Sequence, residues 1–211
     1  MATDWNPSSV HPALSAKFLT PIADLIWKVQ RKVSKHVQPQ EGDDNWVAGC
    51  TAYKRRVHAL TQMSLEEGYR DWLWAGHLDT QFGIRIHGFP IRIYRSLEEG
   101  GIPERYALGS PGELNLLADL NLKYDAIYRL EVVTKKLGRP LDIRIVEVNE
   151  GTGDITNSAA IPRSRDVDAP VAKADLSVRS IRRKPAVVLP KPTVKPNEEK
   201  RANPNEKEKP A

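Results

Sequence analysis

Residues 82–94 read FGIRIHGFPIRIY, and isoleucines alternate with glycine, arginine and histidine along this stretch. Alternation with a period of two is typical of β-strands that bury one face. Folding the stretch about Gly88 pairs Ile86 with Ile91 and leaves the other isoleucines on the same face. Pro90 has no N–H, which favours an open four-residue loop at the tip. The stretch therefore predicts an antiparallel hairpin.

The polar face of this hairpin carries a group of arginines. The predicted register places Arg85 directly opposite Arg92, and two like charges across a strand pair are unfavourable unless an anion or an acid lies between them. Arginine binds phosphate or carboxylate in a bidentate manner, and a neighbouring aromatic ring can stack on a base. The candidate anion- or partner-binding residues are Arg85, Arg92, Tyr94 and Arg95. The alternative is internal pairing with glutamates that follow the hairpin: Glu98, Glu99 or Glu104.

Helical periodicity predicts helices before and after the hairpin. The first lies within 12–37, with its main part starting at Thr20-Pro21, and the second starts at Asn45. A short third helix over 64–76 and a last helix over 110–137 have capping residues at their starts. The predicted buried side of the second helix comprises Trp46, Cys50, Tyr53, Val57 and Leu60, which makes Cys50 a core thiol.

A second hairpin is expected after the last helix, from strands over 141–148 and 154–161 joined by a glycine-rich turn. Helices and hairpins that are segregated along the chain are typical of an α+β domain. We expect three or four helices packed on one face of a small antiparallel sheet made of the two hairpins. The domain is expected to span 12–161, after a flexible N-terminus over 1–11.

Residues 162–211 differ in composition from the rest of the chain. They hold eight of the sixteen prolines and thirteen Lys and Arg against seven Asp and Glu, but none of the fourteen aromatic residues. Such a segment cannot build a core, so a disordered basic tail is predicted. Three uses stay open: a solubilising extension, a docking peptide at 187–189, or nucleic-acid binding through Arg182, Arg183 and Lys184.

Composition also limits the classes of function. Cys50 is the single cysteine, which excludes an internal disulfide and a multi-cysteine metal site and fits a reducing compartment. No run of about eighteen apolar residues occurs, and the first ten residues lack the apolar centre of a signal peptide. A cytoplasmic protein that does not insert into a membrane is expected. The sequence pI of about 9.3 arises mainly from the tail.

No motif identifies a catalytic centre. His77, Asp79 and His87 are close in sequence, but their spacing fits no standard metal site. The glycines of 151–153 suit a hairpin turn, because no strand-to-helix phosphate loop surrounds them. A nucleophile elbow of the G-x-S-x-G type is absent from the sequence. We therefore predict no metal and no cofactor, and we identify no catalytic residue.

Together these features favour a non-enzymatic cytoplasmic interaction protein. Its partner would be a protein or an anionic molecule, with nucleic acid as one candidate, bound through the sheet face with Arg85 and Arg92 and through the basic tail. The alternative is a small metal-dependent hydrolase or nuclease that uses acids around Asp79, Asp142 and Glu147. The lysine that positions water in many nuclease cores is missing next to these acids, which weakens the alternative.

Overall fold

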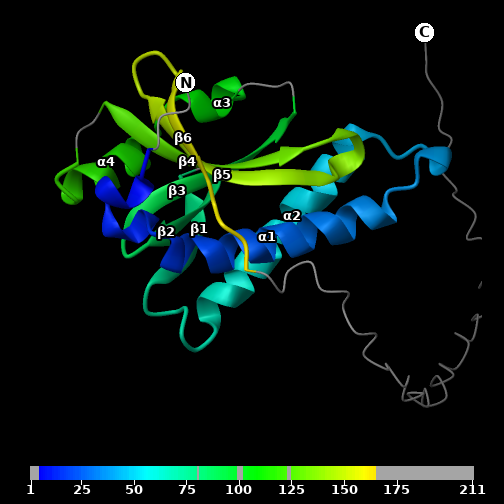
Figure 1. Ribbon diagram of the computed structural model, residues 1–211, viewed down its shortest axis with the longest axis horizontal. Helices are drawn as coiled ribbons and strands as arrows, with labels where there is room; N and C mark the ends of the chain where they lie inside the picture. Colours follow the sequence, from blue (N-terminus) through cyan, green and yellow to red (C-terminus); the bar gives the residue numbers. More distant parts are fainter. Residues whose placement is uncertain (1–4, 80, 99–101, 123–124, 165–211) are drawn as a thin grey trace, which may run out of the picture. The chain divides into compact units, whose positions relative to one another are not determined.

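The structure is a computed structural model that describes residues 5–79, 81–98, 102–122 and 125–164. Figure 1 shows long and short helices arranged around one sheet. The helices are α1 (Ala16–His36), α2 (Asn45–Leu65), α3 (Glu104–Ala107) and α4 (Pro111–Asp119). The strands are β1 (Leu73–Leu78), β2 (Gln81–Ile86), β3 (Phe89–Leu97), β4 (Ala126–Thr134), β5 (Pro140–Asn149) and β6 (Ile155–Ala160).

The six strands lie in the order of the sequence, from β1 to β6. Every neighbouring pair is antiparallel except β3 and β4, which are parallel and are joined by the crossover that contains α3 and α4. The α+β class is therefore confirmed, but the sheet is mixed and the prediction of a purely antiparallel sheet is wrong. Two antiparallel meanders of three strands meet at the parallel β3–β4 pair.

The prediction of one helix over 110–137 missed β4. Helix α4 stops at Asp119, where Asn121 adopts a left-handed conformation with φ 57° and Leu122 N–H bonds to the Leu117 carbonyl. This is a standard helix ending, with asparagine in the place of the usual glycine. Strand β4 is buried on both faces, although Arg129 and Glu131 alternate with apolar residues along it; the prediction instead followed Ile127 and Leu130, which continue the helical spacing of α4.

The β2–β3 hairpin is present, but its tip and register differ from the prediction. Ile86 pairs with Phe89, and the turn consists only of His87 and Gly88. Both turn residues have positive φ, 49° and 85°, as a tight type I′ turn requires. Pro90 lies inside β3 rather than in an open loop. Because the register differs by two residues, the isoleucines still share one buried face.

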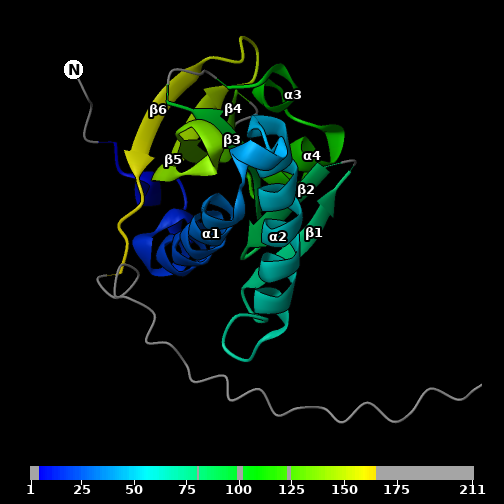
Figure 2. The same ribbon diagram turned by 90° about the vertical axis from the view of Figure 1, so that its right-hand side faces the viewer.

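The helices cover both faces of the sheet, not one face as predicted (Figure 2). Neighbouring side chains of β3 show this arrangement, because they point to opposite faces. Arg95 reaches α2, where its Nη1 donates to the Asn45 carbonyl at 3.3 Å. Tyr94 contacts Tyr106 of α3 on the other face, with ring centroids 5.6 Å apart. Thus α1 and α2 pack on one face, and the α3–α4 crossover covers part of the other.

Helix α2 is continuous and presents a different side to the core from the one predicted. Small residues near its start let it approach the turn at Gly138, where Ala48 and the α1 residue Gln30 both pack closely. The Gln30 Nε2 donates to the Gly138 carbonyl at 2.8 Å. The buried residues of α2 are Ala48, Ala52, Arg56, Leu60 and Met63, whereas Trp46, Cys50 and Tyr53 are exposed. The predicted core thiol is therefore a surface thiol.

The segment after α2 forms a turn and then a strand instead of a third helix. Gly68 has φ 88°, and the Trp72 indole donates to its carbonyl at 2.7 Å. Strand β1 then begins at Leu73 and pairs with β2. The capping pattern at residue 64 therefore marks the end of α2 rather than the start of a new helix.

Both ends of the described chain contact the core. Trp5 and Val10, in the segment predicted to be flexible, pack against it. At the other end, Thr20 Oγ1 donates to the Pro162 carbonyl at 3.0 Å, and the Arg163 guanidinium lies 4.0 Å from the Trp27 ring centroid. The predicted tail residues Arg182, Arg183 and Lys184 lie outside the described residues. None of the helices in the described ranges has the length and apolar character needed to cross a membrane.

Candidate anion-binding site

Arg92 belongs to a buried cluster with Glu113 and Arg129 under the α3–α4 crossover. Only 3% of Arg92 is exposed, and its Nε lies 3.3 Å from the Glu113 Oε2. Arg129 lies beside Arg92 across the parallel ladder and binds both carboxylate oxygens of Glu113. The predicted site residue Arg92 thus shares the Glu113 carboxylate with Arg129 through a charge contact without a hydrogen bond at its Nε, and it faces the interior of the domain.

Arg129 is fully satisfied by hydrogen bonds. Besides the two bonds to Glu113, it donates to the carbonyls of Tyr106 at 2.9 Å, Tyr128 at 2.9 Å and Leu108 at 3.1 Å. These bonds employ all five guanidinium N–H groups. Burial lowers the pKa of Arg129, and the adjacent Glu113 carboxylate partly restores it. The cluster therefore fixes the crossover to the sheet.

The other predicted residues do not share one open site. Arg85 lies opposite Pro90 on β3, and its guanidinium stacks on Trp74 with 4.3 Å to the ring centroid. Tyr94 is fully buried against α3, and this burial, together with the charge of Glu131, raises the pKa of its phenol. Arg95 projects from the opposite face of β3, toward α2. The predicted group is therefore divided among three environments.

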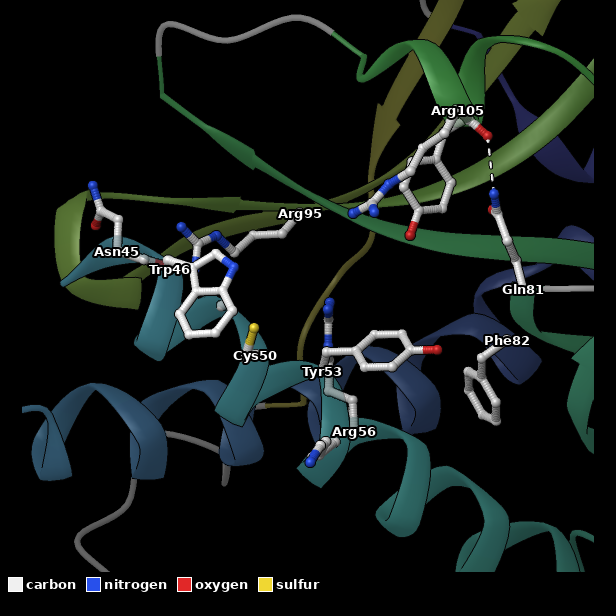
Figure 3. Close-up of a pocket in the computed structure, with 12 residues that line it drawn as sticks. Asn45, Trp46, Cys50, Tyr53, Arg56, Gln81, Phe82, Arg95 and Arg105 are labelled. Carbon is white, nitrogen blue, oxygen red and sulfur yellow. Dashed lines mark hydrogen bonds between the residues drawn. The ribbon is translucent and has the colours of Figure 1, made fainter. Parts of the chain in front are cut away.

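Arg95 lines a different site, a cavity of about 630 Å³ between α2, α3 and the open end of the β2–β3 hairpin (Figure 3). We call it the arginine pocket and define it by six residues: Trp46, Tyr53, Arg56, Gln81, Arg95 and Arg105. The cavity exists because β3 continues to Leu97, while β2 begins only at Gln81, which leaves a recess beside the last residues of β3. No acidic residue is among the described residues that line it.

Arg56 is the most unusual residue of the pocket. It is only 5% exposed, and its Nη1 has no hydrogen-bond partner among the described residues. Its pKa is lowered from 12.5 to about 10, mainly by burial and also by the positive charge of Arg95, while the phenols of Tyr106 and Tyr53 act in the opposite direction. A buried guanidinium without a carboxylate partner is costly for the fold.

Arg95 is held in place by neutral groups. Its Nη1 donates to the Asn45 carbonyl at 3.3 Å, and Figure 3 shows its side chain extending toward the start of α2. Gly49 makes room for it, because a Cβ at that position would lie 3.1 Å from the Arg95 Nη1. Burial lowers the pKa of Arg95. Its contact with a carbonyl orients the guanidinium and leaves its positive charge uncompensated.

The third arginine, Arg105, is carried by α3 at the opposite wall. The Gln81 Nε2 donates to the Arg105 carbonyl at 3.3 Å, the bond drawn as a dashed line in Figure 3. The Arg105 guanidinium lies 5.1 Å from the ring centroid of Tyr106. The hydrogen bond between Gln81 and Arg105 links the crossover to the start of β2 and closes one side of the pocket.

Aromatic side chains form the remaining wall. Trp46 is 74% exposed and Tyr53 is 39% exposed, and both project from α2 with Cys50 between them in the sequence. Their spacing of seven residues places them on one side of the helix. The sequence prediction assigned this side to the core, but the alanines at 48 and 52 mark the buried side. Small residues at intervals of four are the signal that could have identified it.

The acids of the enzymatic alternative do not meet. Asp79 accepts from Gly112 N–H at 3.2 Å, and Asp142 pairs with Arg144 at 2.8 Å. Glu147 accepts from the Tyr128 hydroxyl at 3.1 Å. Asp142 and Glu147 are five residues apart on β5, so they point to opposite faces. No group of three or more His, Cys, Asp or Glu side chains able to hold a metal ion occurs in the described part of the chain.

The arginine pocket combines three arginines and Lys54 with exposed aromatic surface, and it offers an unpartnered donor in a largely desolvated position. Guanidinium groups in such a setting suit a carboxylate or a phosphate. When the chain is compared with known proteins, it matches no protein family, no curated protein and no solved structure.

Proposed function

We propose that this protein binds an anionic ligand whose charged group enters the arginine pocket. The observation that carries the proposal is the state of Arg56, which is buried, charged and without a partner at Nη1 among the described residues. The buried β4 residue Arg129 has five acceptors, two of which are the carboxylate oxygens of Glu113. Arg56 has no such carboxylate partner among the described residues, so an anion would supply what the described part of the chain lacks.

The electrostatic environment favours such a ligand. Repulsion from the positive charge of Arg95 contributes to the lowered pKa of Arg56. An anion between them removes this repulsion and supplies the missing acceptor. Both guanidiniums are at least half desolvated, so their attraction for an anion is screened less by water than at an open surface.

This proposal keeps the anionic partner expected from the sequence and moves the site. Arg95 belongs to both sites, while Arg85 and Arg92 are replaced by Arg56 and Arg105. The basic tail retains its predicted role as a second, weaker contact to a large anionic partner. Two linked contacts would raise the apparent affinity for such a partner above that of the pocket alone.

The proposal is tested by titrating the protein with inorganic phosphate and tripolyphosphate in a calorimeter. Arg56→Met should weaken tripolyphosphate binding at least tenfold, because it removes the unpartnered donor and its charge. Arg55→Met is the matched control on the exposed side of α2 and should leave binding within twofold. Equal binding by both variants would contradict the proposal. Loss of binding in Arg85→Gln alone would return the site to the sheet face.

A further inference from the structure

The pocket has two unsatisfied groups of opposite kind. Arg56 Nη1 is a donor without a partner, and Gln81 Oε1 is a buried acceptor without a partner, in each case among the described residues. The orientation of the Gln81 amide is set by the bond from its Nε2 to the Arg105 carbonyl. A ligand that satisfies the pocket must therefore present an anionic group and a hydrogen-bond donor at the same time.

The side chains that line the pocket indicate which part of the ligand connects its anionic group to its hydrogen-bond donor. Tyr53 and Trp46 expose ring surface beside the arginines, and neither Trp46 nor Tyr53 has a ring partner among the described residues. Flat ligands with a π-system stack on such side chains, and each of the nucleobases can do so. Every nucleobase also carries a hydrogen-bond donor on its Watson–Crick edge or its exocyclic amine.

The size of the pocket agrees with a ligand larger than a simple anion. Its volume of about 630 Å³ lies inside the range of about 300–1,000 Å³ that is usual for small-molecule sites. Inorganic phosphate would fill a small part of it and would leave Gln81 Oε1 without a donor. A nucleotide would reach the arginines with its phosphate and the aromatic wall with its base.

We infer that the anionic ligand is a nucleoside phosphate, bound with its phosphate at Arg56 and Arg95 and its base against Tyr53 or Trp46. The inference rests on the proposed function and deepens it. The same chemistry is offered by a free nucleotide and by a single strand of nucleic acid. In both cases Gln81 Oε1 accepts from the base, and the exposed edge of α2 provides the stacking surface.

Cys50 makes the binding event directly measurable. It is the single cysteine of the chain, it is exposed, and it lines the pocket between the two aromatic residues. A nucleotide in the pocket should shield its thiol from N-ethylmaleimide, a small neutral reagent. We expect AMP at saturation to slow alkylation of Cys50 at least fivefold. Ribose 5-phosphate, which has the phosphate and no base, should bind at least tenfold more weakly than AMP.

Three variants distinguish the contribution of the base to binding from that of the phosphate. Tyr53→Ala together with Trp46→Ala should weaken AMP at least tenfold more than it weakens tripolyphosphate, because the base needs the rings and tripolyphosphate has no base. Tyr53→Phe with Trp46→Phe retains the rings and should behave like the unmodified protein. Gln81→Met removes the acceptor and should weaken AMP more than ribose 5-phosphate.

A penta-adenylate strand separates the two sources of nucleotide. Affinity more than tenfold above that of AMP assigns the site to single-stranded nucleic acid, and affinity within threefold assigns it to the free nucleotide. The inference is overturned if ribose 5-phosphate binds as tightly as AMP or if the alanine variants bind AMP unchanged. In either case tripolyphosphate binding that depends on Arg56 would leave the proposed function intact, whereas absence of any anion binding would overturn both.

Discussion

Glu113 accepts hydrogen bonds from both terminal nitrogens of Arg129, at the point where the crossover is fixed to the centre of the sheet. Arg92 approaches the same carboxylate, so one buried negative charge serves two buried positive charges. Arg56, on the other side of the sheet, is equally desolvated but has no carboxylate partner among the described residues. One arginine cluster therefore supports the fold, and the other is available to a ligand.

Removing the charge of Glu113 should destabilise the domain strongly. In Glu113→Gln the two buried guanidiniums lose their counter-charge, which typically costs about 3–5 kcal/mol in the free energy of unfolding. Urea denaturation followed by circular dichroism measures this loss. Asp142→Asn is the control, because its pair with Arg144 is partly exposed and should contribute less than about 1 kcal/mol. Similar losses in both variants would contradict a structural role of the cluster.

Replacing Arg56 by methionine should stabilise the protein in the absence of ligand. The pKa of Arg56, lowered from 12.5 to about 10, indicates a penalty of up to about 3 kcal/mol for keeping the buried group charged. Methionine fills similar space without charge, so Arg56→Met should raise the free energy of unfolding by about 1–3 kcal/mol. Arg55→Met on the exposed side of α2 should change it by less than about 0.5 kcal/mol. A destabilised Arg56→Met variant would show that a partner for Arg56 has been missed.

The protein should lose stability in alkaline solution. Burial and the charge of Glu131 raise the pKa of Tyr94, and burial together with Glu147 raises the pKa of Tyr128. The unfolded phenols ionise near pH 10, whereas the folded ones stay protonated, so their stabilisation is complete below about pH 10 and decreases above it. The slope should reach at most about 1.4 kcal/mol per pH unit for each phenol.

Urea denaturation between pH 8 and pH 11 measures this dependence, and Tyr128→Phe should reduce it. Arg56 acts in the opposite direction, because its folded pKa is lowered. Between about pH 10 and 12.5 the folded state releases a proton that the unfolded state keeps, so stability rises. Arg56→Met should therefore steepen the alkaline loss. A Tyr128→Phe variant with an unchanged alkaline loss would contradict the assignment of the phenol, and an Arg56→Met variant with an unchanged slope would contradict that of Arg56.

The domain should require residues 162–164. Ser164 N–H donates to Asp24 Oδ1 at 3.3 Å, and Arg163 and Pro162 also contact α1. A chain that ends at residue 164 should unfold with the same free energy as the full chain. A chain that ends at Ile161 should lose about 1–3 kcal/mol, since it lacks a cation–π contact and three hydrogen bonds. Differential scanning calorimetry distinguishes the two, and equal stability would place the domain boundary at Ile161.

Elements with strong local signals were predictable from the sequence. The 3.6-residue period of α1 and the alternating isoleucines of the β2–β3 hairpin depend on neighbouring residues, and both were identified. The type I′ turn was missed because His87 occupies a position that usually carries asparagine or glycine. Strand β4 was missed because Ile127 and Leu130 also continue the helical spacing of α4, and this spacing was preferred to the alternation along the strand.

The candidate site was only partly predictable. The rule that facing arginines need an acid or an anion between them was sound, but it applies to Arg92 and Arg129 across the parallel ladder, with Glu113 as the acid. Arg129 and Glu113 could not be matched with Arg92 before the crossover was known. Arg56 was not predicted because its burial depends on how α2 packs. The prediction placed the large Trp46 in the core, whereas the alanines of α2 face the core.

The parallel ladder between β3 and β4 has a consequence for how the protein folds. Each meander can form from contacts between neighbouring segments, but Arg92 and Arg129 repel each other when the two halves meet. Docking of α4 brings Glu113 between them and turns repulsion into attraction. Joining of the two halves is thereby coupled to a nine-residue helix, and a chain without the Glu113 carboxylate would bring two like charges together at that joint.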